Sequence, residues 1–165
     1  MEFIANAPAL EVLKLNNNGM GPAGGEMIAG ALLENAKKAE REGKKSSLRV
    51  LVCGKENSHF GLCRRIITHS WTVLTGRNRL ENGSSKAFAE AYAALGTLRE
   101  VRMPQNGIRM EGIEAIVKGL QQCKDLEYLD LQDNTATEKG SRAIAKSLPS
   151  LVSLLGFRLI SILKC

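Results

Sequence analysis

The sequence predicts an α/β solenoid with short parallel strands on its concave face and helices on its convex face. The word L-x-x-L-x-L-x-x-N, read from Leu126 to Asn134, recurs 28 residues upstream from Leu98 and again from Leu10. After each of these asparagines, glycine follows at the sixth place, isoleucine at the tenth and leucine at the fourteenth. Since three independent positions keep the same register, the chain is expected to form a leucine-rich repeat horseshoe segment.

Each part of the repeat word has a physical task. Leu126, Leu129 and Leu131 are expected to point into the core from a short strand, and the amide of Asn134 to bond backbone where the chain turns away. A side chain at the shared glycine place would crowd the packing of strand against helix. We expect one partial repeat domain over residues 1–165, with repeats starting near residues 10, 48, 98 and 126.

The first repeat is longer than the others. Its surplus over the 28-residue pitch fits the charged segment 35–47, which we interpret as a helix extension and a loop. Basic and acidic residues alternate there, which is typical of a solvated helix end, and the aromatics needed for base stacking are missing. The net charge of +6 therefore does not favour a nucleic-acid partner.

The second repeat is interrupted. Asn78 follows Leu48 by 30 residues where the other repeats have 8, and removing the block 55–76 restores both this spacing and the repeat pitch. Cys53 then falls on a core position, and Phe88 and Tyr92 take the places of the helical isoleucine and leucine. The block is either a loop on the strand-to-helix edge or an unspliced intron translated in frame. We favour the intron, because an insertion at the strand exit would disturb the register.

The two ends depart from the pattern. No atypical end unit precedes Leu10, so we expect a fragment that starts inside a longer array and has low stability. Residues 152–165 diverge: Leu154, Phe157 and Leu159 fit a fifth strand, whereas a donor-like Val152-Ser153 coding sequence fits read-through to a stop. No signal peptide or membrane-spanning run is seen, and we expect no membrane association.

Residues just before the repeat asparagines should line one polar rim of the horseshoe. They are Asn17, Arg77, Gln105 and Asp133, beside the concave residues Lys14, Arg102 and Asp130. A solvated rim and a protein-docking edge both fit this pattern, and docking is the usual work of the scaffold. No catalytic motif is present, and His59, Cys63 and His69 match no metal-site spacing, so we expect neither metal nor cofactor.

Several strings resemble the Ran GTPase-activating protein of fungi over residues 7–151, apart from the block. They are Leu15 to Pro22, Cys53-Gly54 joined to Arg77 through Ser84, Gln105 to Ile108 with Glu111 to Glu114, and Leu129 to Asn134. The resemblance implies a regulator of the nuclear-transport GTPase Ran in its GTP-bound form, a monomer in the cytoplasm or at the nuclear envelope, rather than an enzyme with its own active site.

The resemblance also implies residue roles. In that family an asparagine matching Asn17 helps to hold the GTPase's own glutamine, which orients the attacking water, and no arginine finger is supplied. Rim position makes Lys14, Arg77, Arg79, Gln105 and Asp133 candidates for partner binding. The alternative function is a non-catalytic leucine-rich adaptor whose rim binds another protein.

The intron hypothesis has a direct test. Gly54-Lys55 can be encoded by a donor-like sequence and Thr75-Gly76 by an acceptor-like one, and removing 22 codons keeps the reading frame. Amplification of the transcript across codons 50–80 should yield a shorter product that lacks the block. Messages that always carry the block would refute the hypothesis.

Overall fold

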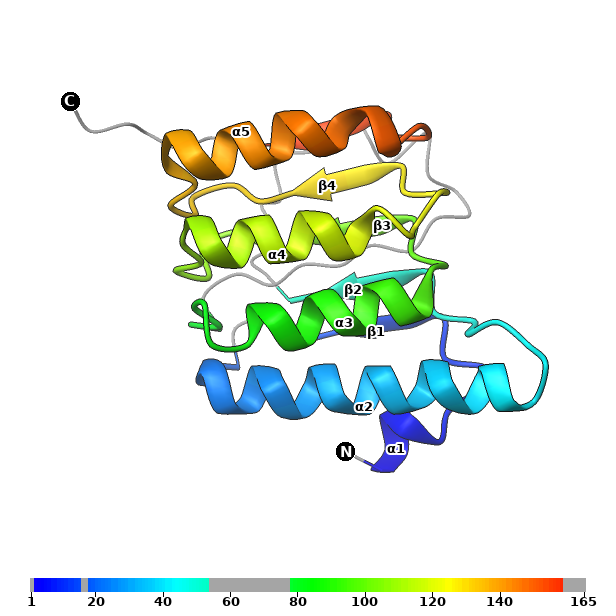
Figure 1. Cartoon of the computed structure of the whole chain (residues 1–165). Helices are drawn as coiled ribbons and strands as arrows, with labels where there is room; N and C mark the ends of the chain where they lie inside the picture. The colour runs from blue at the N-terminus through cyan, green and yellow to red at the C-terminus, as the bar shows by residue number, and fades with distance from the viewer. Residues whose placement is uncertain (1, 16–17, 54–77, 159–165) are drawn as a thin grey trace, which may run out of the picture.

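The computed structural model describes residues 2–15, 18–53 and 78–158. Five three-residue strands form one parallel sheet in chain order. Helices stack in the same order along one face of this sheet (Figure 1). The strands are β1 (Val12–Lys14), β2 (Val50–Val52), β3 (Glu100–Arg102), β4 (Tyr128–Asp130) and β5 (Gly156–Arg158). The helices are α1 (Glu2–Ala5), α2 (Gly21–Arg41), α3 (Ser85–Leu95), α4 (Met110–Leu120) and α5 (Thr137–Ser147), followed by the 3-10 turn η2 (Leu148–Ser150).

The strands that follow residues 10, 48, 98 and 126 pair in one parallel register. Leu13 pairs with Leu51, Leu51 with Val101, and Val101 with Leu129, so the fourth residue of every repeat lies in one row. A fifth strand is present, because Phe157 continues the row beside Leu129. Whether residues 152–165 arise by read-through stays a prediction. Four strand-and-helix coils and one additional strand therefore share a single strand register.

A continuous apolar core lies between the sheet and the helices. The inward residues of the third and fourth repeats, such as Leu98, Val101 and Leu129, are fully buried. Phe88 and Tyr92 of α3 are also fully buried, with ring centroids 5.8 Å apart. The join predicted across the block thus gives the second repeat a helix with its apolar residues in the expected places.

Three of the four repeat asparagines, Asn78, Asn106 and Asn134, bond successive coils together, whereas the side chain of Asn18 is exposed. The Asn78 amide donates to the Leu15 carbonyl (2.7 Å), the Asn134 amide donates to the Met103 carbonyl (2.7 Å), and the Asn106 amide is 3.5 Å from the Cys53 carbonyl. Each acceptor is the sixth residue of the preceding repeat. In return, the Oδ1 atoms of these asparagines accept backbone N–H groups of the preceding coil, including that of Asn78 at Asn106 (3.2 Å). We call this series the asparagine ladder.

The ladder shows that the second repeat closes as predicted. Cys53 and Asn78 are neighbouring parts of one coil, because both engage Asn106 of the next coil. The entire block 55–76 that separates them in sequence lies outside the described residues, as do its flanking residues Gly54 and Arg77. Whether the block is a loop or an intron remains a prediction.

The surplus of the first repeat is a helix extension and a loop, as predicted. Helix α2 has 21 residues, whereas α3, α4 and α5 have 11 each. Buried Asn35 lies in the extension, where its amide donates to the carbonyls of Ile4 and Ala7 (3.0 Å each) and its oxygen accepts from Ser46 (2.8 Å). This asparagine therefore fixes α1 and the following loop on α2. In the described part of the chain, no helix is long and apolar enough to cross a membrane.

The glycines act mainly where neighbouring helices approach, which differs from the predicted crowding against the strand. A Cβ on Gly112 would lie 2.6 Å from Ser85 Oγ of α3 and 2.6 Å from Ile108 Cγ2. At Gly24 it would meet only the Met20 side chain (2.9 Å). Gly119 of α4 was not identified as important from the sequence. Because glycine has no side chain, this residue can lie against the Ala89 backbone of α3. The glycines at 112 and 119 therefore permit the close approach of α4 to α3.

Replacement of Gly119 by alanine should destabilise the protein by about 1–3 kcal/mol, because the new methyl group would force α3 and α4 apart at Ala89. The matched control is Gly30→Ala in α2, where a Cβ meets no atom within 4 Å. That change should stabilise by about 0.5–1 kcal/mol through helix propensity. Urea unfolding measures both, and equal effects of the two substitutions would contradict the close approach.

Replacement of Asn106 by alanine should cost about 2–3 kcal/mol, since it leaves the Asn78 N–H and the Cys53 carbonyl of the preceding coil without their partner. Asn18→Ala provides the control. Its side chain is exposed, so the free energy of unfolding should change by less than about 0.5 kcal/mol. An Asn106→Ala protein as stable as the control would remove the ladder as a source of stability.

Candidate functional site

The polar rim lies where the strands end and the chain turns toward the helices. Gln105 and Asp133, the residues before two ladder asparagines, have φ angles of +55° and +57°. Such left-handed backbone is uncommon for residues other than glycine. The following asparagines are buried, whereas Asp133 is exposed and Gln105 is half-buried. The sharp turn therefore separates an inward structural amide from an outward rim side chain.

Two predicted rim residues are in direct contact. Nε2 of Gln105 donates to Oδ2 of Asp133 (3.0 Å), and Nε2 of Gln132 approaches the same oxygen (3.4 Å). The bond joins equivalent positions of adjacent coils. The Asp133 carboxylate is consequently held on the rim by two neutral amides, where it remains exposed to a partner.

The other predicted rim residues are spread along the edge. Lys14, the last residue of β1, is exposed, and so is Arg79, which follows Asn78 with φ +53°. Within the described ranges, neither side chain forms an ion pair. Asn17 and Arg77 lie outside the described residues. The structure thus brings Gln105 and Asp133 together and leaves Lys14 and Arg79 as exposed cationic groups.

A polar cluster lies on the outer face of β3 and β4. Arg102 forms an ion pair with Glu100, and its Cζ lies 4.4 Å from the centroid of the Tyr128 ring. Asp130 Oδ1 accepts the backbone N–H of Gln132 (3.0 Å). The Glu100 and Asp130 side chains are buried, which requires such polar partners.

Two members of this cluster were not among the predicted concave residues. Arg102 and Asp130 were identified from the row before the last leucine of the repeat word, but Glu100 and Tyr128 occupy the row two residues earlier. The sequence could have identified Glu100 and Tyr128, because side chains two residues apart in a strand point to the same face, here the one away from the helices. The cluster offers charges, an aromatic face and hydrogen-bonding groups, which suit the binding of a partner.

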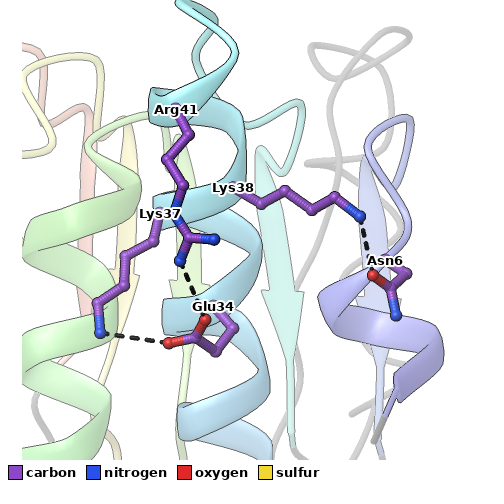
Figure 2. Close-up of polar contacts among 5 residues, drawn as sticks. All are labelled: Asn6, Glu34, Lys37, Lys38 and Arg41. Carbon is purple, nitrogen blue, oxygen red and sulfur yellow. Dashed lines mark hydrogen bonds and ion pairs between the residues drawn. The ribbon is translucent and has the colours of Figure 1, made fainter.

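The basic residues near the end of α2 are largely paired within the protein. Figure 2 shows Lys37 and Arg41 beside Glu34 (3.2 and 3.5 Å) and Lys38 donating to Asn6 (2.9 Å). The ion pairs are about half exposed or more, so each contributes little to stability. Their arrangement agrees with the predicted solvated helix end.

The buried cysteines are unsuited to nucleophilic chemistry. Burial raises the pKa of the Cys123 thiol to about 11, and burial also raises the pKa of Cys53 well above its ordinary value. Since the thiolate is the reactive form, both thiols stay protonated near neutral pH. Cys53 confirms the prediction of a buried core thiol. Throughout the described ranges, no three or more His, Cys, Asp or Glu residues gather as a metal site would require.

Comparison with known proteins agrees with this architecture. The family model described as "Leucine Rich repeat" matches residues 7–29. Leiomodin-1 Actin-Binding Site 2 (ABS2) superposes with a TM-score of 0.66 at 19% identity, covering 98% of this chain and 78% of that one. At this identity the superposition shows the fold alone.

Sequence relatives are more specific. Ran GTPase-activating protein 1 of Saccharomyces cerevisiae is 38% identical over 156 residues, which are 90% of this chain and 31% of that protein. Ran GTPase-activating protein 1 of Xenopus laevis is 42% identical over 99 residues (60% and 13%), and Ran GTPase-activating protein 2 of Caenorhabditis elegans is 41% identical over 104 residues (63% and 8%).

The chain spans less than a third of the length of these relatives. They include animal as well as yeast proteins, so the likeness is not specific to the fungal type. This chain is a leucine-rich repeat solenoid related in sequence to one segment of the Ran GTPase-activating proteins.

Proposed function

We propose that this chain stimulates GTP hydrolysis by Ran in its GTP-bound form. The observation that carries the proposal is the 38% identity to a yeast Ran GTPase-activating protein over 90% of the chain. The chemistry would take place in the GTPase, and this chain would act as a regulator bound at its rim. The exposed rim residues Lys14, Arg79 and Asp133 support such docking, because charges at an interface guide association and fix its register.

Asn17 is the proposed catalytic residue. By sequence register it is the counterpart of Gln105 and Asp133, the two residues whose outward rim position supports this role. Asparagine also tolerates the left-handed backbone observed at those counterparts. We further propose Arg77, Arg79, Gln105, Asp133 and Lys14 as partner-binding residues, with Arg77 assigned by sequence register alone.

The proposed mechanism is positioning. A neutral amide can donate to and accept from another amide, so Asn17 would hold the glutamine of the GTPase in the orientation that directs the attacking water. It would add no positive charge to the transition state, and Arg79 would bind the partner without serving as an arginine finger. We also propose that the chain acts as a monomer in the cytoplasm or at the nuclear envelope.

Replacement of Asn17 by alanine should reduce the stimulated rate of GTP hydrolysis by about tenfold to a hundredfold, because the amide of the GTPase glutamine loses its fixed partner. The measurement is single-turnover hydrolysis by Ran loaded with GTP, with this chain in excess. Binding, followed by the change in mobility of labelled Ran, should weaken much less than the rate.

Asn6→Ala is the matched control. It removes an exposed asparagine beside Lys38, before β1 and therefore at the opposite edge of the sheet, and should leave the stimulated rate unchanged (Figure 2). A rate that is equally high in the Asn17→Ala protein would remove Asn17 from the mechanism. Binding to Ran without any stimulation by the unaltered chain would favour the adaptor instead.

A further inference from the structure

The sequence contains three asparagine-glycine pairs, Asn18-Gly19, Asn82-Gly83 and Asn106-Gly107. Glycine offers little steric protection to the preceding side-chain amide, so such pairs are the usual places of spontaneous deamidation. The structure holds the three asparagines in different ways. We propose that Asn18 is a covalent modification site, deamidating in the native protein while Asn106 stays protected and Asn82 reacts at an intermediate rate.

The reaction needs only water. The backbone nitrogen of Gly19 attacks Cγ of Asn18, the new N–Cγ bond closes a five-membered succinimide, and the Cγ–Nδ2 bond breaks. The amide nitrogen leaves as ammonia with the proton from Gly19. Water then opens the ring at either carbonyl, giving aspartate or isoaspartate, and no oxidant or reductant takes part.

The side-chain amides differ in their freedom to reach this geometry. Asn106 is fully buried, its amide lies 3.3 Å from the Pro104 carbonyl, and its oxygen accepts the N–H of Asn78 (3.2 Å). Asn82 is half-buried; its oxygen accepts the N–H of Arg109 (2.8 Å) and its amide donates to Glu111 (3.0 Å). Asn18 is exposed, and its side chain has no hydrogen-bond partner among the residues described.

The three glycines do not account for the difference. Gly19 and Gly107 both have left-handed backbone, with φ of +58° and +69°. No hydrogen bond engages the backbone N–H of Gly19, Gly83 or Gly107 within the described ranges. The attacking nitrogen is therefore equally available at each pair, and the hold on the asparagine side chain sets the order of rates.

The product would alter the rim turn. The N–H of Asn18 donates to Asn78 Oδ1 (2.8 Å), and the N–H of Gly21 donates to the Asn78 carbonyl (2.8 Å). An isoaspartate at residue 18 adds one atom to the backbone between these two bonds, and either product adds a negative charge next to residue 17. A loss of Ran stimulation after deamidation rests on the proposed function, whereas the chemical modification does not.

The test is to age the unaltered chain at mildly alkaline pH and to follow each pair by peptide mass spectrometry. In the native protein, Asn18 should convert at least about tenfold faster than Asn106, because each hydrogen bond that must break slows the reaction. Asn82 should lie between them. In concentrated urea the three rates should converge, since all three pairs then have the same unprotected chemistry.

Asn18→Gln and Asn82→Gln serve as matched variants, because glutamine cannot close a five-membered ring. The first should remove the fast component of ammonia release from the native protein, and the second should leave it. Native rates at Asn82 or Asn106 equal to that at Asn18 would overturn the proposal. So would an Asn18 rate as slow as that of Asn106. If Asn18 deamidates and Ran stimulation is unchanged, the modification site stands, but the proposed loss of function after deamidation is wrong.

Discussion

The fold depends on a buried side-chain amide that satisfies backbone groups of two successive coils. Strands of three residues give too few sheet hydrogen bonds to set a register unaided. The ladder asparagines add hydrogen bonds at the point where the chain leaves each strand. A buried amide without such partners would destabilise the fold. The ladder thereby ties the strand exit and the rim turn of each coil to those of the preceding coil.

The repeat made much of the architecture readable from the sequence. Leu98, Val101 and Met103 are buried, and Val101 pairs in register with its counterparts. This register could be predicted because apolar residues of similar size recur at the same positions of each repeat. The same reasoning joined Cys53 to Asn78 across the block, and their shared contacts with Asn106 agree with it. Long-range contacts could be predicted here because each coil repeats the environment of the previous one.

Features that break the repeat were less accessible. The left-handed backbone at Gln105 has no sequence signal of its own, because glutamine is not typical of that conformation. The contact of Arg102 with Tyr128 depends on which coils are adjacent and how their polar side chains share space. Asn35 looks like one more residue of a charged helix, yet it is buried and holds α1.

The repeat scaffold fixes the positions of the side chains in the candidate site. Gln105 and Asp133 meet because equivalent positions in adjacent coils lie side by side, so a partner meets an ordered row in place of a set of independent loops. Helix spacing supports the row from behind, since Gly112 and Gly119 permit the close approach of α3 and α4. A binding edge of this kind can change its specificity by changing rim residues without altering the core.

The contacts of Cys53 and Asn78 with Asn106 also imply that the fold could form from two separate pieces of chain. Every ladder bond and strand pair described here would retain both its partners if the covalent chain were severed between these two residues. One piece would supply β1, α2 and β2, and the other would supply α3 onward. Reassembly would then depend on the shared core, so two separately encoded polypeptides could reconstitute a single horseshoe on mixing.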